Sequence, residues 1–206
     1  MPKRVQERFW DSFNLEEMAM IKKKIIACQI FTDELLVVLS ETHRDIDITW
    51  FDLGLHFNLD KLEIFIKQAL KNAAAEGADP RLFFGNGCHP DMCHVINNQG
   101  GKIIGAKNCV EAFCNESIDE SEQNRTKVIT PGWVRFFSNM TSAAGWDAVD
   151  IRQDFSRYDR FLLMDTGINP LSEEEILAFY DLTQVPVEIQ QIDLDHFRAK
   201  VIEVLR

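Results

Sequence analysis

The sequence predicts an α/β protein with a single doubly wound, mainly parallel sheet that has helices on both faces, and with an N-terminal helical arm. The first observation is that short apolar runs alternate with helical patterns from Lys24 onward, joined by short linkers throughout. The second is that the run over residues 25–31 is apolar without strict alternation, which is typical of a strand covered on both faces. We therefore expect residues 1–23 to form the arm and residues 24–206 to form one α/β domain.

Each element is predicted from an apolar run or from helical spacing, bounded by turn or capping residues. Asn58 is placed to cap a helix that stops before Gly77, and Ser172 with Glu175 forms a capping-box pattern. The predicted strands cover residues 25–31, 46–53, 81–84, 102–106, 126–130, 160–164 and 185–192. The predicted helices cover residues 34–41, 60–75, 90–97, 110–114, 145–158 and 194–205, with two more after Pro131 and Ser172.

The composition excludes several classes of function. The 206 residues carry a net charge of −11, and the only basic run is Lys22-Lys23-Lys24, so we expect neither nucleic acid nor a membrane as partner. No strand is followed by a glycine-rich dinucleotide or phosphate-binding fingerprint, so no nucleotide cofactor is expected. Five cysteines without an apolar leader indicate free or metal-bound thiols in a reducing, cytoplasmic setting.

Cysteine or histidine follows each of the first four predicted strands. The residues are Cys28, His56, Cys88 and Cys109. Because parallel strands bring their carboxyl ends to one edge of a sheet, these side chains are expected to gather there. Three thiolates and one imidazole form a ligand set that zinc or iron accepts, whereas the alternative is that the cysteines are ordinary core residues.

Glycine loops at the same edge are candidates for binding a small molecule. Glycines expose backbone N–H groups, His89 begins the next predicted helix, and Trp133 offers an indole. Turn chemistry and simple packing are the alternative interpretation. The candidate substrate-binding residues are Gly85, Asn86, Gly87, His89, Trp133, Thr166 and Gly167, and no catalytic residue is assigned.

Several short motifs carry a resemblance to a known family. They are Ala27-Cys28, the segment from Trp50 to Leu55-His56, Phe84-Gly85-Asn86-Gly87-Cys88, Asn108-Cys109, Thr130-Pro131-Gly132-Trp133 and Asp165-Thr166-Gly167. In this order they resemble an uncharacterised family of bacterial and archaeal cytoplasmic proteins, a domain of unknown function often encoded beside corrinoid-dependent methyltransferases. The resemblance covers residues 24–206. It implies a corrinoid or methyltransferase protein as a partner.

The residues beside the cysteines depart from the family pattern. The family usually has glycine after the first cysteine, a third-strand motif closer to Tyr-Gly-x-Cys-Gly, and aspartate before the last cysteine. This chain has Gln29, Phe84, His89 and Asn108 there.

Three functions fit these observations. The leading one is a metal-thiolate protein, with zinc or iron, that acts on or near a small molecule in corrinoid-linked methyl metabolism. The second is a non-catalytic accessory module whose loops and helix N-termini bind a small molecule or an anion. The third is a thiol enzyme that uses Cys88 with His89, for which no residue that orients the base is visible.

Overall fold

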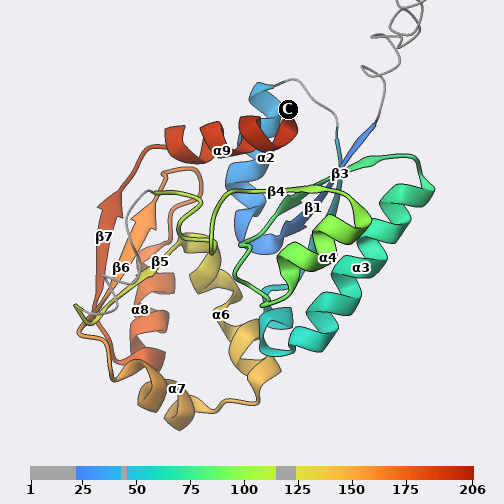
Figure 1. The fold of residues 1–206 in the computed structure, drawn as a ribbon. Coiled ribbons are helices and arrows are strands. Elements are labelled where there is room, and N and C mark those ends of the chain that lie inside the picture. Colours follow the sequence, from blue (N-terminus) through green and yellow to red (C-terminus); the bar gives the residue numbers. More distant parts are fainter. Residues whose placement is uncertain (1–21, 43–45, 115–123) are drawn as a thin grey trace, which may run out of the picture.

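A computed structural model describes residues 22–42, 46–114 and 124–206 of the chain (Figure 1). Its described part is an α/β structure in which every pair of neighbouring strands is parallel. The strands form two sheets, one with four strands and one with three, and helices pack against both. The predicted class is therefore confirmed in its α/β character and its parallel strands.

The first sheet contains the strands from the N-terminal half of the chain in the order β2-β1-β3-β4. β1 lies in the middle and pairs with both β2 and β3. Its residues are buried from Lys24 to Cys28, which agrees with a strand covered on both faces. The bounds are Lys23–Cys28 for β1, Asp47–Phe51 for β2, Asp79–Phe83 for β3 and Lys102–Ile103 for β4.

Helices cover both faces of the first sheet. α3 contacts β1, β3 and α4, whereas α2 contacts α9, which in turn contacts β3. The Asn58 side chain accepts a hydrogen bond from the Lys61 N–H, so it caps α3 as predicted. The bounds are Thr32–Glu41 for α2, Leu59–Ala75 for α3, Met92–Gln99 for α4 and Asp195–Leu205 for α9. Two short 3-10 helices follow the first two strands, η1 at Gln29–Phe31 and η2 at Leu53–Phe57.

The second sheet has the strand order β5-β6-β7. Thr130 and Pro131 begin helix α6, and α6 ends at Gly145 in the left-handed conformation. α8 begins with the predicted capping box of Ser172 and Glu175. The bounds are Thr126–Ile129 for β5, Arg160–Asp165 for β6, Val187–Gln191 for β7, Pro131–Ala144 for α6, Ala148–Phe155 for α7 and Glu173–Thr183 for α8.

The prediction of one continuous sheet is wrong. β4 pairs with β3 over Lys102 and Ile103 only, and β5 pairs with β6 rather than with β4. The predicted helix at residues 110–114 is also wrong, since this segment forms turns. The Asn108 side chain accepts hydrogen bonds from the Val110 and Glu111 N–H groups, which stabilises a turn instead. The predicted arm lies outside the described residues, apart from Lys22 and Lys23.

The last helix joins the two halves of the chain. α9 follows β7 of the second sheet but packs against the first sheet, where the ring of Phe197 stacks on those of Phe113 and Phe31 at 4.7 and 5.5 Å. An ion pair between Arg198 and Glu41 of α2 also holds α9 against the first half of the chain. The C-terminal helix therefore completes the core of the N-terminal half.

Candidate functional site

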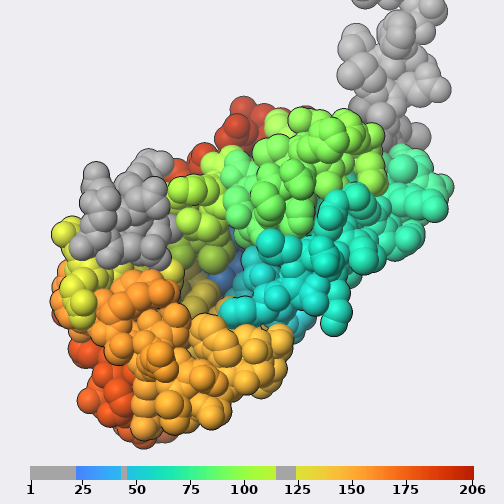
Figure 2. All heavy atoms as spheres, turned by 60° about the horizontal axis from the view of Figure 1, so that its bottom comes forward, coloured from blue at the N-terminus to red at the C-terminus, as the bar shows by residue number. Residues whose placement is uncertain are grey.

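A cavity of about 460 Å³ lies between the two halves of the chain. Figure 2 shows the surface hollowed between the cyan and green first half and the orange second half. Residues at the end of β1 or after the strands of the first sheet form one wall: Cys28, Phe31, Leu53, His56, Phe57, Phe84, Gly85, Gly87, Cys88, Asn108 and Cys109. The other wall comes from β5, α6, α7 and the segments that follow α6 and α7: Lys127, Trp133, Phe137, Met140, Thr141, Trp146, Asp154, Phe155 and Arg157.

Two cysteine-bearing loops of the first wall are packed backbone against backbone. The Asn86 N–H donates to the Ala106 carbonyl and the Gly87 N–H to the Lys107 carbonyl, both at 2.9 Å. A Cβ at Gly85 would lie 2.5 Å from the Cα of Asn108. Only glycine permits this approach, which brings Cys88 and Cys109 to the same cavity wall.

Glycines also bring α6 against the first sheet. A Cβ at Gly132 would lie 2.6 Å from the Ile30 carbonyl oxygen in η1, and one at Gly54 would lie 3.2 Å from the Ala143 Cβ. The Asp52 side chain accepts from the Gly54 N–H at 2.6 Å and thereby begins η2. The N-terminal end of α6 is thus held next to the end of β1, where Cys28 is located.

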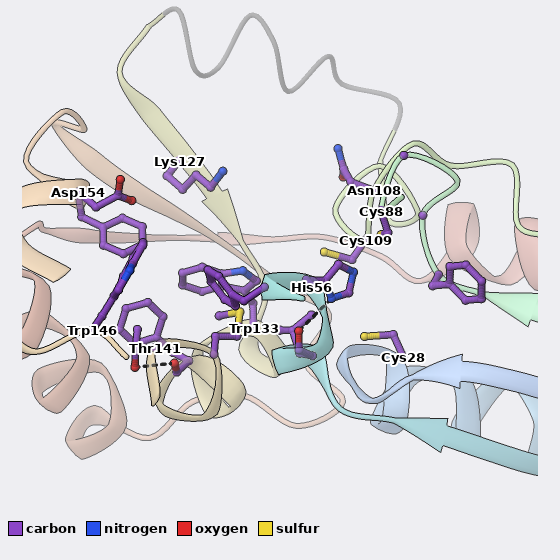
Figure 3. Close-up of a pocket in the computed structure, with 18 of the residues that line it drawn as sticks. Cys28, His56, Cys88, Asn108, Cys109, Lys127, Trp133, Thr141, Trp146 and Asp154 are labelled. Carbon is purple, nitrogen blue, oxygen red and sulfur yellow. Dashed lines mark hydrogen bonds between the residues drawn. The ribbon is translucent and has the colours of Figure 1, made fainter. Parts of the chain in front are cut away.

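The structure brings all four predicted metal ligands to this cavity (Figure 3). In Figure 3 the sulfurs of Cys28 and Cys109 both point from the strand ends towards the aromatic residues. Burial raises the pKa of Cys88 to about 11 and that of Cys109 to about 12, and the neighbouring Cys88 thiol adds to the shift at Cys109. Burial also raises the pKa of Cys28 well above its usual range, with smaller contributions from the other two thiols.

His56 presents one nitrogen that is fixed by the backbone. Its Nδ1 lies 2.9 Å from the Leu53 carbonyl oxygen, so Nδ1 carries the proton and Nε2 keeps its lone pair. Burial lowers the pKa of His56, which keeps the ring neutral at pH 7. A neutral imidazole whose second nitrogen donates to a carbonyl is the arrangement found in most metal-binding histidines.

Aromatic side chains fill the far end of the cavity. Trp133 packs on Phe137 with ring centroids 5.1 Å apart and meets Phe155 edge-on at 6.1 Å. Phe57 of η2 and Trp146 after α6 meet at 5.8 Å, one from each wall. Trp133 was predicted as a binding residue and does line the cavity.

Sequence reasoning missed much of the second wall, including Lys127, Trp146, Asp154 and Arg157. Lys127 alone had a usable signal, because it lies in a short apolar strand that ends near a predicted site residue. Trp146 follows α6, and Asp154 and Arg157 lie in or just after α7. An amphipathic pattern there does not show which face of the helix packs against the first half of the chain.

The other predicted binding residues divide into two groups. Gly85 and Gly87 line the cavity, whereas Asn86, His89, Thr166 and Gly167 are not among the residues that line it. The ring of His89 is buried, and its Nδ1 accepts from the Asp91 N–H at 3.0 Å. Thr166 donates to the buried Glu34 at 3.1 Å, and the Gly167 N–H donates to Asp165 at 2.8 Å. These contacts serve the fold and the junction between the halves.

The side chains of the predicted metal ligands are not arranged as a metal site in this structure. Within residues 22–42, 46–114 and 124–206, no group of three or more His, Cys, Asp or Glu side chains is arranged to hold a metal ion. All five cysteines are free thiols. No helix in the part of the chain that the structure describes is long and apolar enough to cross a membrane.

The fold and the cavity together define a parallel α/β protein with a thiol-rich and aromatic chamber between two sheets. Residues 50–201 match the family described as "Protein of unknown function (DUF1638)". Because the match covers more than half of the chain, the chain belongs to this family. No curated protein and no solved structure matches the chain.

Proposed function

We propose that the chain binds zinc or iron through Cys28, Cys88, Cys109 and His56 and holds a small organic molecule beside it in the aromatic chamber. The observation that carries this proposal is that all four donors line one cavity although they come from four separate segments. Three thiols and a neutral imidazole are a donor set that both metals accept. When bound, the metal would act as a Lewis acid towards a thiol or a methyl-bearing molecule.

The residues around the donors fit this role. The backbone contact between Gly85 and Asn108 fixes the relative positions of two cysteines, and the Leu53 carbonyl orients His56. The raised pKa values of Cys88 and Cys109 mean that metal binding must displace thiol protons. We therefore expect affinity for the metal to increase as the pH rises. The resemblance to the corrinoid-associated family adds methyl metabolism in the cytoplasm as the proposed setting.

Metal analysis with matched cysteine variants tests the proposal. Chelator-treated protein is incubated anaerobically with Zn²⁺ or Fe²⁺, desalted and analysed for metal per chain. We expect one tightly bound metal in the unmodified protein and its loss in Cys88→Ser, because such a site rarely survives the loss of a thiolate. Cys93→Ser is the matched control, since Cys93 is exposed on α4 and is not among the residues that line the cavity. Equal metal content in both variants would refute the assignment.

The second candidate is a non-catalytic module that binds a small molecule without metal. The observation in its favour is that the described ligands are not arranged as a metal cluster. This candidate predicts ligand-dependent stabilisation of chelator-treated protein and no retention of zinc or iron after desalting.

A further inference from the structure

The buried part of the cavity lining is apolar, and the charged lining residues are the more exposed ones. Phe84 and Phe137 line the cavity and are 1% and 3% exposed. Among the described lining residues, the charged side chains are Lys127, Asp154 and Arg157. Asp154 and Arg157 pair with each other at 3.4 Å with side chains 31% and 62% exposed, and Lys127 is half-buried. These charged groups can therefore stay hydrated while the interior of the cavity is filled.

The titratable side chains beside the ends of the first-sheet strands carry no charge at pH 7 in the metal-free protein. Burial raises the pKa of Cys88 to about 11 and that of Cys109 to about 12, and it also raises the pKa of Cys28. Burial lowers the pKa of His56, so the imidazole is neutral as well. Its Nδ1 donates to the Leu53 carbonyl, and its Nε2 is the proposed metal donor. This wall of the cavity therefore presents no charge to a ligand.

Other polar side chains of the lining are already bonded within the protein. The Thr141 hydroxyl donates to the Phe137 carbonyl at 3.1 Å. The side-chain oxygen of Asn108 accepts from two backbone N–H groups of its own turn, both at 3.0 Å. In the part of the chain that the structure describes, the buried side-chain atoms without a hydrogen-bond partner belong to Gln29 and Arg81, which do not line the cavity. An apolar ligand would therefore leave neither Thr141 nor Asn108 without a partner.

Aromatic rings and sulfur atoms make up much of the remaining lining. Trp133 packs against Phe137 and Phe155, and these two phenylalanines meet each other at 5.5 Å. The sulfurs of Cys28 and Cys109 point towards these rings in Figure 3. Rings and polarizable sulfur favour another aromatic ring, because such contacts add to the gain from buried area. A volume of about 460 Å³ lies in the range of small-molecule sites.

We infer that the cavity binds an uncharged molecule with an aromatic ring, which lies against Trp133 and Phe137. An apolar body gains free energy when it leaves water for this interior. A carboxylate or an ammonium group would lose its hydration there, and the buried lining residues would not replace it. This inference rests on the proposed function for its site and names the class of ligand, but it does not require the metal.

A set of three probes that share a phenyl ring tests this inference. Propylbenzene, phenethylamine and phenylacetate carry an uncharged, a positive and a negative tail of similar size. Binding to chelator-treated protein is measured at pH 7 by calorimetry and by the change in tryptophan fluorescence. We expect propylbenzene to bind at least tenfold more tightly than either charged probe, because only the charged tails lose their hydration.

Variants of the tryptophans assign the binding to the cavity. We expect Trp133→Leu to weaken propylbenzene binding at least fivefold, because it removes an aromatic ring from the lining. Phe136→Leu is the matched control, since Phe136 is also half-buried on α6 but does not line the cavity, and its effect should stay below twofold. Circular dichroism shows whether each variant is folded. Trp146→Leu provides a second test from a different segment, with an expected loss of at least threefold.

Three outcomes would overturn the inference. They are failure of propylbenzene to bind, equal or tighter binding of phenethylamine or phenylacetate, and unchanged propylbenzene binding in the folded tryptophan variants. Metal retention is measured separately, so its absence together with selective propylbenzene binding would refute the metal centre alone. Retained zinc without selective propylbenzene binding would refute the uncharged aromatic ligand alone.

Discussion

Gly85 and Asn108 approach so closely that the segment after β3 and the segment after β4 are in direct backbone contact. A Cβ on Gly85 would lie 2.5 Å from the Asn108 Cα and would also overlap the Lys107 carbonyl oxygen. Because backbone atoms on both sides would have to move, the contact allows glycine only. The relative positions of Cys88 and Cys109 depend on this contact.

We expect Gly85→Ala to lower the free energy of unfolding by about 1–3 kcal/mol, the usual cost of overpacking. It should also weaken binding in the cavity, since the two cysteine loops must separate. Urea unfolding and the zinc content after anaerobic loading and desalting measure the two effects. Gly105→Ala is the control, because there the added Cβ would meet only the flexible end of Lys200 at 3.4 Å. Equal effects of both variants would show that the Gly85 contact is not special.

The raised thiol pKa values predict a loss of stability at alkaline pH. Unfolded thiols release their protons near the ordinary value of 9.0, whereas Cys88 and Cys109 keep theirs to about 11 and about 12. Between these values the unfolded state binds fewer protons than the folded state, so the free energy of unfolding falls as the pH rises above about 9. Urea midpoints measured without metal should show a shallower fall in Cys109→Ala. Cys93→Ala should leave the slope unchanged.

His56 predicts a pH dependence on the acid side. Its pKa is lowered from 6.5 by burial, so below pH 6.5 the unfolded state takes up a proton that the folded state resists. Stability should therefore fall as the pH drops below 6.5, and His56→Gln should reduce that slope. Chemical denaturation at a series of pH values tests this. Nitrogen-15 spectra of the ring should show the proton on Nδ1, and a proton on Nε2 of the neutral ring would contradict the assignment.

The burial of Phe197 predicts that α9 is essential for the stability of the N-terminal half. Its side chain is fully buried between Phe31 and Phe113, so Phe197→Ala should cost about 3–5 kcal/mol of unfolding free energy. Leu177→Ala is the control on α8, where the side chain is 61% exposed and the cost should stay within about 0.5 kcal/mol. Thermal and urea unfolding measure both. A small effect at Phe197 would mean that the first sheet is stable without its last helix.

The strands and most helices could be predicted from the sequence because their signals are local. Apolar runs mark strands such as β1, and capping residues such as Asn58 and Ser172 mark where helices begin. Strand pairing is not local. Nothing in the composition of residues 102–106 distinguishes an edge strand of two residues from a central one, so the break between the two sheets could not be read from the sequence.

The cavity wall that carries the cysteines and His56 could be predicted from the sequence for the same reason. Cysteine or histidine following a strand is a local feature, and parallel pairing of β1 with β2 and β3 brings such positions to one edge. The other wall depends on how the second half docks against the first. Trp146 and Asp154 line the cavity because the two halves pack together in this way. The spacing of apolar residues along the chain does not predict that packing.

Because the cavity lies between the two sheets, a ligand bound in it should make the two sheets unfold together. Each wall belongs to a half of the chain with its own sheet. The two halves are joined by the packing of α6 against η1 and η2, and by the packing of α9 against α2 and β3. A ligand that touches both walls binds only when both are folded, so it adds its binding free energy to their association. Hydrogen exchange should then show the two sheets opening separately in the empty protein and together in the filled one.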